Sequence, residues 1–401
     1  MKDQDENIGN ESIENESNNN SSPSIPPIAI GAREVGDSSL GLNSFAIEVN
    51  NLSKNYHSKK SGKFAGIGKT PTVGDESNLV PLQGLGVIGD KGNINSPPFI
   101  PLAGGVGGSS SNFGGISFSV LPGEIFGIIG PDGAGKTTLF RILTTLILAD
   151  SGKASVDGFD VVSDYKEIRK RVGYMPGKFS LYQDLTVEEN LNFFATVFNT
   201  TIEENYDLIK DIYQQIEPFK TRRAGKLSGG MKQKLALCCA LIHKPSVLFL
   251  DEPTTGVDPV SRKEFWGMLK KLKAQGITIL VSTPYMDEAG LCDRIALIQN
   301  GQFLKIDTPQ NIVSQYENKL WAVQSDNMPK LLKDLRNNEL TKNCFAFGDK
   351  HHLSIDNLPS ITIGITIDNL KEQLENLGHT NIEIREIEPT VEDCFMQLSQ
   401  R

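Results

Sequence analysis

The run "GPDGAGKTT" fits the pattern G-x-x-x-x-G-K-[ST], whose residue types suit the binding of phosphate groups. It follows an apolar segment with the pattern of a buried strand and precedes the helical pattern "LFRILTTL". Glycines let the backbone wrap a phosphate, and the amides at a helix start present partial positive charge. A chance glycine-rich turn is the alternative, but it does not explain the strand and the helix on either side. The predicted phosphate-binding residues are Gly130, Pro131, Asp132, Gly133, Ala134, Gly135, Lys136, Thr137 and Thr138.

Two of these residues have specific chemistry. Lys136 would reach the β- and γ-phosphates of a nucleotide, and the hydroxyl of Thr137 would bind Mg²⁺.

The run "SVLFLDEPTTGVDP" (246–259) places two acidic residues directly after four apolar ones. The apolar residues predict a buried strand, and the carboxyl ends of strands are where α/β proteins bind ligands. Asp251 would hold Mg²⁺ through water, and Glu252 would act as the general base toward an attacking water. Alone, such a pair could instead be charges at a helix N-terminus. Together with the phosphate loop, the pair favours catalysis.

The run "KLSGGMKQKLALCCALI" (226–242) places a serine and two glycines at the start of a predicted helix, an arrangement that binds anions. Taken alone, it would be only a capped helix. Because it lies between the phosphate loop and the aspartate strand, it looks like the signature motif of ATP-binding cassette (ABC) ATPases. The chain resembles this family over about 45–56 and 114–310.

This resemblance implies a head-to-tail dimer that holds two ATP molecules, with Mg²⁺, between its subunits. Each ATP would meet the phosphate loop of one chain and Ser228, Gly229 and Gly230 of the other. Tyr56 looks like the aromatic residue that stacks on adenine, and Asp258 looks like part of the loop after the aspartate strand. ATP would close the dimer and hydrolysis would open it.

Short apolar strands alternate with helical patterns from Glu124 to about Leu304, which predicts a mostly parallel sheet covered by helices. The strand candidates are 125–129, 171–175, 246–250, 277–282 and 294–298. A hairpin turn is expected at Asn300-Gly301. The resemblance implies the class: an α/β fold, the P-loop NTPase nucleotide-binding domain of ABC proteins, with an antiparallel β subdomain and a helical subdomain.

We predict three parts along the chain. Residues 1–42, rich in Asn, Ser and acidic residues, are expected to be disordered because they carry too little apolar surface to fold. Residues 43–314 are the predicted ABC ATPase domain, with a Gly/Ser/Pro-rich insertion at about 57–113. Residues 315–401 are a predicted small α/β domain.

The predicted C-terminal domain has strand patterns at 361–367 and 381–387, and a helical pattern at 368–377. On that helix, one face carries Leu370, Leu374 and Leu377.

The formal net charge of −9 argues against a nucleic-acid partner, which needs clustered basic residues. No apolar run approaches the roughly 18 residues that cross a bilayer, and no secretory segment follows Met1, so we expect a cytoplasmic chain. The run "EIEPTVEDCFMQL" (386–398) resembles the tail of ABC subunits from multidrug and polysaccharide exporters, which implies a separate integral membrane permease. We therefore expect an ATP-binding and hydrolysing subunit that energises export, bound peripherally to the cytoplasmic face of the cell membrane.

The first departure from the family pattern is Gly177, where the family usually has a glutamine that contacts Mg²⁺ and water. Pro176-Gly177 suits a type II turn, in which the glycine would have a positive φ. Gln183, six residues further on, is an alternative source of the missing amide.

The second departure is Pro284, where the family usually has a histidine that senses the nucleotide. We expect Thr283 to cap a helix whose first residue is Pro284, with Asp287 and Glu288 in its early turns. Both missing side chains would face the γ-phosphate side of the site, so the rate of hydrolysis is expected to be reduced.

Three alternatives stay open. The chain could hold ATP in a slow site of a heterodimeric pair and lend its signature motif to its partner. It could be a soluble ABC ATPase of translation or DNA repair, although it has one cassette and no heptads. It could also be a non-hydrolysing ATP sensor.

Overall fold

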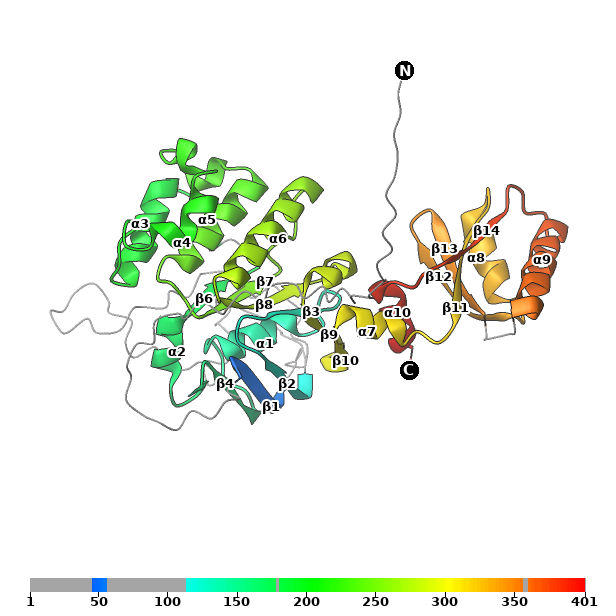
Figure 1. The fold of residues 1–401 in the computed structure, drawn as a ribbon, viewed down its shortest axis with the longest axis horizontal. Coiled ribbons are helices and arrows are strands. Elements are labelled where there is room, and N and C mark those ends of the chain that lie inside the picture. Colours follow the sequence, from blue (N-terminus) through cyan, green and yellow to red (C-terminus); the bar gives the residue numbers. More distant parts are fainter. Residues whose placement is uncertain (1–44, 56–112, 178–179, 356–359, 401) are drawn as a thin grey trace, which may run out of the picture. The chain divides into compact units, whose positions relative to one another are not determined.

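The protein is represented by a computed structural model that describes residues 45–55, 113–177, 180–355 and 360–400 (Figure 1). The predicted tail, Tyr56 and almost all of the predicted insertion lie outside the described residues. Within the described ranges, the strands form three sheets.

The central sheet is mostly parallel, as predicted. Its strand order is β10-β9-β3-β8-β7-β6, and β9–β10 is the only antiparallel pair within this sheet as the structure describes it. The strands are β3 (Ile125–Ile129), β6 (Val172–Met175), β7 (Val247–Asp251), β8 (Thr278–Thr283), β9 (Arg294–Gln299) and β10 (Gln302–Asp307). Every residue of β3, β7 and β8 is buried, as expected for strands covered on both faces. The predicted hairpin is confirmed, with Asn300 and Gly301 both at positive φ.

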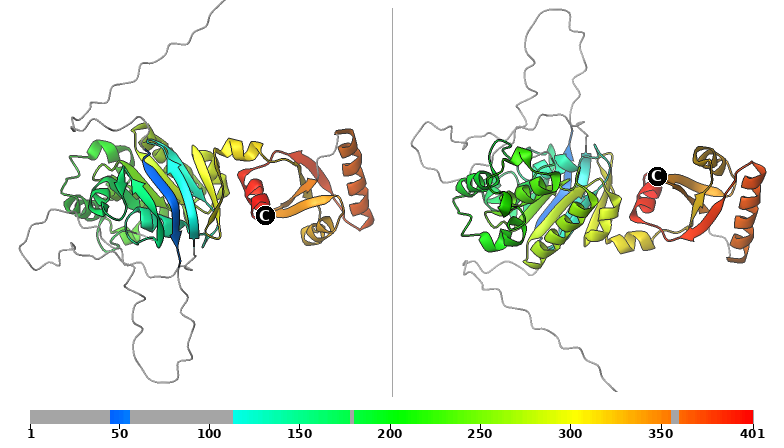
Figure 2. Two further views of the ribbon diagram at one scale, coloured as in Figure 1. Left: turned by 90° about the horizontal axis from the view of Figure 1, so that it is seen from below. Right: turned by 90° about the horizontal axis from the view of Figure 1, so that it is seen from above.

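A second, antiparallel sheet of order β2-β1-β4-β5 confirms the predicted β subdomain. Its strands are β1 (Ile47–Lys54), β2 (Phe113–Val120), β4 (Ser151–Val156) and β5 (Phe159–Asp160). Figure 2 shows β1 and β2 side by side, in agreement with their antiparallel register. The ring of Phe118 on β2 stacks on Phe126 of β3 with 5.5 Å between centroids, which joins this sheet to the central one.

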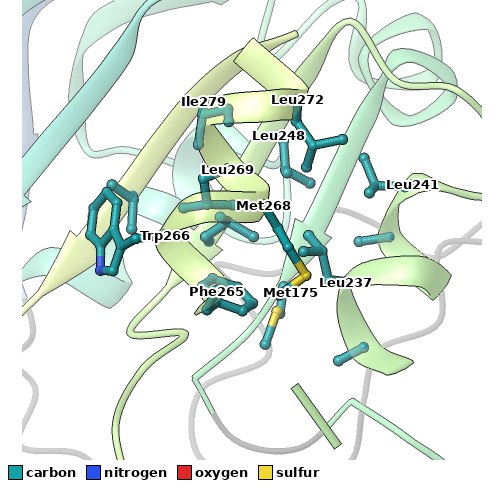
Figure 3. Packing of buried hydrophobic residues seen from close by; sticks show 14 of the residues in the cluster. Met175, Leu237, Leu241, Leu248, Phe265, Trp266, Met268, Leu269, Leu272 and Ile279 are labelled. Atoms are coloured by element: carbon teal, nitrogen blue, oxygen red, sulfur yellow. The ribbon is translucent and has the colours of Figure 1, made fainter. Parts of the chain in front are cut away.

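Helices cover the central sheet and carry the predicted motifs. They are α1 (Lys136–Leu143), α2 (Tyr165–Arg171), α3 (Val187–Val197), α4 (Tyr206–Tyr213), α5 (Gly229–Leu241) and α6 (Pro259–Ala274), with short turns η2 (Glu217–Phe219) and η3 (Ala224–Lys226). Figure 3 shows Met268 of α6 beside Met175 of β6 and Leu237 of α5, all in one buried cluster. Helix α6, which begins just after Asp258, is thus fixed by its apolar face.

The C-terminal region contains a third sheet, antiparallel, of order β12-β13-β11-β14. After α7 (Pro309–Ser314) come β11 (Lys319–Gln324), α8 (Met328–Arg336), β12 (Thr341–Phe347), β13 (Lys350–Ile355), α9 (Ser360–Asn376), β14 (Glu383–Ile387) and α10 (Val391–Leu398). Helix α10 packs into the same cluster as the central sheet, and the Cys394 thiol lies 3.5 Å from the carbonyl oxygen of Ile312 on α7. The boundary at 314/315 remains a prediction.

The predicted strand at 361–367 is wrong, because these residues belong to α9. The β-branched residues there favour a strand only weakly, and tertiary context overrides such preferences. Leu370 and Leu374 lie on α9 and are buried in the C-terminal core, where they anchor the helix. Leu377 lies beyond the end of α9 and is 53% exposed, so it does not share the helix face of the other two as predicted.

His243, just after α5, gives the fold a pH dependence. Its Nε2 lies 3.1 Å from the carbonyl oxygen of Val172, its ring stacks on Phe198, and its buried Nδ1 has no hydrogen-bond partner among the described residues. Burial lowers the pKa of His243 to about 4. The pKa of His243 in the folded protein is below the ordinary value of about 6.5. The contribution of the neutral ring to folding stability is therefore complete above pH 6.5 and is lost as the pH falls towards 4.

We expect acidification through that window to cost on the order of 3 kcal/mol of folding free energy through this group. Thermal unfolding against pH, compared between the wild type and His243→Phe, measures it. The variant should show a shallower fall below pH 6.5. Parallel curves would assign the acid sensitivity to other groups.

Candidate functional site

The loop of residues 130–135 connects β3 to α1 and folds around one ammonium group. Lys136 is 3% exposed, and its Nζ donates to the carbonyl oxygens of Gly130 at 2.8 Å and Pro131 at 3.0 Å. Gly135 has φ 104°, and a Cβ on Gly130 would lie 2.1 Å from the carbonyl oxygen of Ile298. The loop therefore requires glycine at both positions.

Glu252 is the next partner of Lys136, with its Oε1 3.1 Å from Nζ. Its backbone has φ 51°, a conformation that is costly for a residue with a Cβ. The amide of Glu252 donates to the Ser282 hydroxyl at 3.0 Å, and this bond holds the residue in that conformation. Strained residues of this kind concentrate at functional sites.

Asp251, at the end of β7, is 2% exposed and accepts a 2.7 Å hydrogen bond from the Ser282 hydroxyl. The Thr137 hydroxyl bonds to the same carboxylate. Burial raises the pKa of Asp251, while the bonds from Ser282 and Thr137 act in the opposite direction. The two predicted magnesium ligands thus lie in contact, with oxygen donors that a hard cation prefers.

Pro284 follows β8, which lies between β3 with its phosphate loop and β7 with Asp251. The predicted helix start is wrong here. Thr283 still belongs to β8 and its hydroxyl donates to the Glu288 carboxylate at 2.5 Å, so it caps no helix. The turn η4 (Met286–Leu291) begins two residues after Pro284, with Tyr285 at its N-cap, and its first turn does contain Asp287 and Glu288.

Gly177 lies against the end of β7. A Cβ at this position would be 2.9 Å from the Asp251 carbonyl oxygen and 3.7 Å from the Glu252 Cβ. The prediction of a positive φ is wrong, because Gly177 is not in that region. Close approach of two backbones, not a turn conformation, is what requires glycine here.

The predicted substitute, Gln183, is exposed and its carbonyl oxygen accepts from Gly225, before the signature helix.

The signature residues lie against the turn after the aspartate strand. Ser228 is the N-cap of α5, and its hydroxyl accepts from the Met231 amide at 3.3 Å. A Cβ on Gly230 would lie 2.7 Å from the Ser261 hydroxyl. Asp258, the N-cap of α6, accepts from the Ser261 amide at 3.0 Å. Two helix N-termini therefore meet here.

Two residues in or beside the site, Ser282 and Glu288, have contacts that the sequence did not indicate. Ser282 contacts both acidic residues, and its only sequence signal is a hydroxyl near the end of an apolar strand. Glu288 is 2% exposed and pairs with Arg262, although acidic residues are rarely buried.

The chain is similar to known proteins over most of the described core. Residues 113–255 match the model of a family described as "ABC transporter". The chain is 44% identical over 209 residues to the "Probable multidrug ABC transporter ATP-binding protein YbhF" of Escherichia coli (strain K12), covering 52% of this chain and 36% of that protein. It is 33% identical over 291 residues to the "Nod factor export ATP-binding protein I" of Rhizobium sp. (strain N33), covering 72% of this chain and 91% of that protein.

This chain belongs to the ABC transporter family. The ABC fold is also seen in a solved structure titled "Structure of ATP binding subunit of ABC transporter", with a TM-score of 0.50 and 23% identity, covering 68% of this chain and 93% of that one. Family membership implies that this ABC protein binds nucleotide. Among the described residues, no helix combines the length and hydrophobicity that crossing a membrane requires.

Proposed function

We propose that this chain is the ATP-binding and hydrolysing subunit of an ABC exporter, which energises a separate integral membrane permease. The observation that carries the proposal is the convergence of Lys136, Glu252 and the Asp251–Thr137 pair at the carboxyl ends of β3 and β7. Such a cluster of opposite charges around a glycine loop suits the binding and cleavage of a phosphate chain.

Each residue has a role in this proposal. Lys136 neutralises the β- and γ-phosphates, while the amides of the loop 130–135 hold them. Thr137 and Asp251 would hold Mg²⁺, which would offset the negative charge of the phosphates when bound. Glu252 accepts a proton from the attacking water.

The ion pair between Lys136 and Glu252 would change on ATP binding. In the structure, the ammonium lies 3.1 Å from the carboxylate that we propose as the base. A γ-phosphate competes for that ammonium, so binding frees the carboxylate to face water. Substrate binding and base activation are thereby coupled through one side chain.

A second ABC subunit completes the proposed site. The exposed signature tip, Ser228 and Gly229, would contact ATP held by the partner's phosphate loop, and Asp258 lies beside that tip. Tyr56 would stack on adenine. The names of the relatives, a multidrug ABC transporter protein and a Nod factor export protein, support export as the process. A peripheral place on the cytoplasmic face of the membrane is part of the same proposal. The chain spans only 36% of the first of them.

Gly177 and Pro284 favour a second candidate function. In it, the chain holds ATP in a slow site of a heterodimeric pair and lends Ser228–Gly230 to a faster partner. The same fold and dimer serve both candidates, so the turnover of the purified chain distinguishes them.

Co-purification tests the export proposal. A tagged chain isolated from its own cells after mild detergent extraction should carry an integral membrane protein, and ATP turnover should rise in that complex. Recovery of the chain only in the soluble fraction, with no membrane protein attached, would contradict transport.

A further inference from the structure

A buried carboxylate contacts the turn of residues 252–258, which follows Asp251, and has no role in the site described above. Glu288, in η4, is 2% exposed. It accepts hydrogen bonds from the Thr283 hydroxyl at 2.5 Å, the Arg262 Nε at 3.0 Å and the Thr254 hydroxyl at 3.1 Å. A carboxylate that is removed from water needs such a set of donors.

The three donors come from three segments around the site. Thr254 follows Glu252 by two residues and is itself 1% exposed. Thr283 ends β8, next to Pro284, and its carbonyl oxygen accepts from Gly130 at the start of the phosphate loop. Arg262 lies in the first turn of α6, four residues after Asp258. Glu288 therefore joins the turn 252–258 to the end of β8.

Arg262 is held on more than one side. Its Nη2 lies 3.0 Å from Oε1 of Glu288 and 3.1 Å from Oδ2 of the exposed Asp287. Its guanidinium carbon lies 4.1 Å from the centroid of the Tyr285 ring. Planar guanidinium groups suit such combined pairing and stacking. The cation thus ties α6 to the segment 285–288 that follows Pro284.

We propose that Glu288 and Arg262 are positioning residues that hold the turn carrying Glu252 and Asp258 against the end of β8. The inference rests on the proposed function in one respect, that Glu252 is the base. Neither side chain touches Lys136 or Asp251 in the hydrogen bonds of the described residues, so both act through Thr254, Thr283 and the backbone. Gly177 and Pro284 offer no side-chain contact to the γ-phosphate, so the position of Glu252 rests on the bond to Ser282 and, in this proposal, on the contacts of Glu288 and Arg262.

The test compares Glu288→Gln with Glu264→Gln in the full-length chain. Glu264 is also an ion-paired glutamate, 2.8 Å from Lys234, but it lies on the outer face of α6 and is half exposed. For Glu288→Gln we expect the kcat of phosphate release to fall at least about tenfold while the Kd for ATP changes less than about twofold. Glu264→Gln should leave both unchanged.

A double variant that removes both charges checks that the ion pair between Glu288 and Arg262 is responsible for the loss of kcat. In Glu288→Gln, Arg262 loses its buried partner; in Glu288→Gln with Arg262→Met, no buried charge is left without a partner, and only the exposed Asp287 loses one. The double variant should therefore be no slower than Glu288→Gln alone, whereas independent effects would multiply. Multiplied losses would overturn the proposed pairing.

Hydrogen–deuterium exchange without nucleotide gives a readout that does not need turnover. Amides of Thr255 and Val257, which bond within the turn, and of Tyr285, which donates to Thr283, should exchange faster in Glu288→Gln and not in Glu264→Gln. Thr254→Val, which removes one donor and keeps the shape, replaces Glu288→Gln if that variant does not fold, and should show the same change to a smaller extent.

Unchanged exchange in these segments, or a loss of kcat matched by an equal loss of ATP affinity, would overturn the inference. Absence of turnover in the wild type would instead contradict the proposed function, and the exchange result would still decide the role of Glu288.

Discussion

Replacing Glu252 by glutamine is expected to lower the rate of ATP hydrolysis roughly 100- to 10 000-fold, the range that general bases contribute. Glutamine keeps the size of the side chain and leaves the hydrogen bond from the backbone amide to the Ser282 hydroxyl in place, but it cannot act as the general base. ATP affinity should stay the same or rise, because Lys136 loses the carboxylate that competes with phosphate for it. Phosphate release and binding of a fluorescent ATP analogue measure the two quantities.

The exposed Glu188, paired with Lys220 at 3.4 Å, provides the control for loss of one acidic charge. Glu188→Gln should behave as the wild type. Turnover that persists in Glu252→Gln would place the base elsewhere.

Restoring the usual glutamine at position 177 is expected to lower the activity, not to raise it. The new Cβ would lie 2.9 Å from the Asp251 carbonyl oxygen, and backbone cannot move aside as a flexible side chain can. Overpacking of this kind costs about 1–3 kcal/mol. Since the strain falls on Asp251 and Glu252, we expect kcat to drop at least about tenfold and the unfolding temperature to fall.

Two alanine variants separate the close contact from a general effect of losing glycine. Gly177→Ala adds only the offending Cβ and should cause most of the loss of stability. Gly267→Ala, on α6, should be neutral or stabilising, because no described atom outside the adjacent residues and the helix backbone lies within 4 Å of the new Cβ. A rate that rises in Gly177→Gln would show that the loop has room for the usual contact.

Pro284→His is the companion change and should have the opposite sign. Pro284 begins no helix, so its replacement removes no cap, and the position lies at the end of the strand between β3 and β7. A histidine there would add a donor on the γ-phosphate side, and steady-state phosphate release should rise. A lower rate would show that proline itself supports the site.

The motifs and the central strands could be predicted because each rests on a local pattern. The phosphate loop is a spacing of glycines and a lysine. The strand that ends at Asp251 is an uninterrupted apolar run up to that residue, and the strand that ends at Thr283 has an apolar centre, Ile279–Val281. The exposed tip at Ser228 follows from helix capping, which is also local.

What could not be predicted depends on contacts between distant segments. The reason for glycine at 177 is the carbonyl oxygen of a residue 74 positions away. The burial of Glu288 depends on donors from three segments. One of them is the hydroxyl of Thr283, which donates to this carboxylate, whereas the sequence predicts that it caps a helix. In the C-terminal region, the start of α9 at Ser360 goes against local strand preference.

The central claim is that Glu252 supports hydrolysis without the usual side chains at 177 and 284. Steady-state phosphate release by the purified full-length chain, at saturating ATP with and without Mg²⁺ and with Glu252→Gln as the blank, tests it most directly. The account predicts Mg²⁺-dependent turnover well above the blank. A wild-type rate equal to that of Glu252→Gln, with ATP bound in both, would contradict it and favour the slow-site subunit.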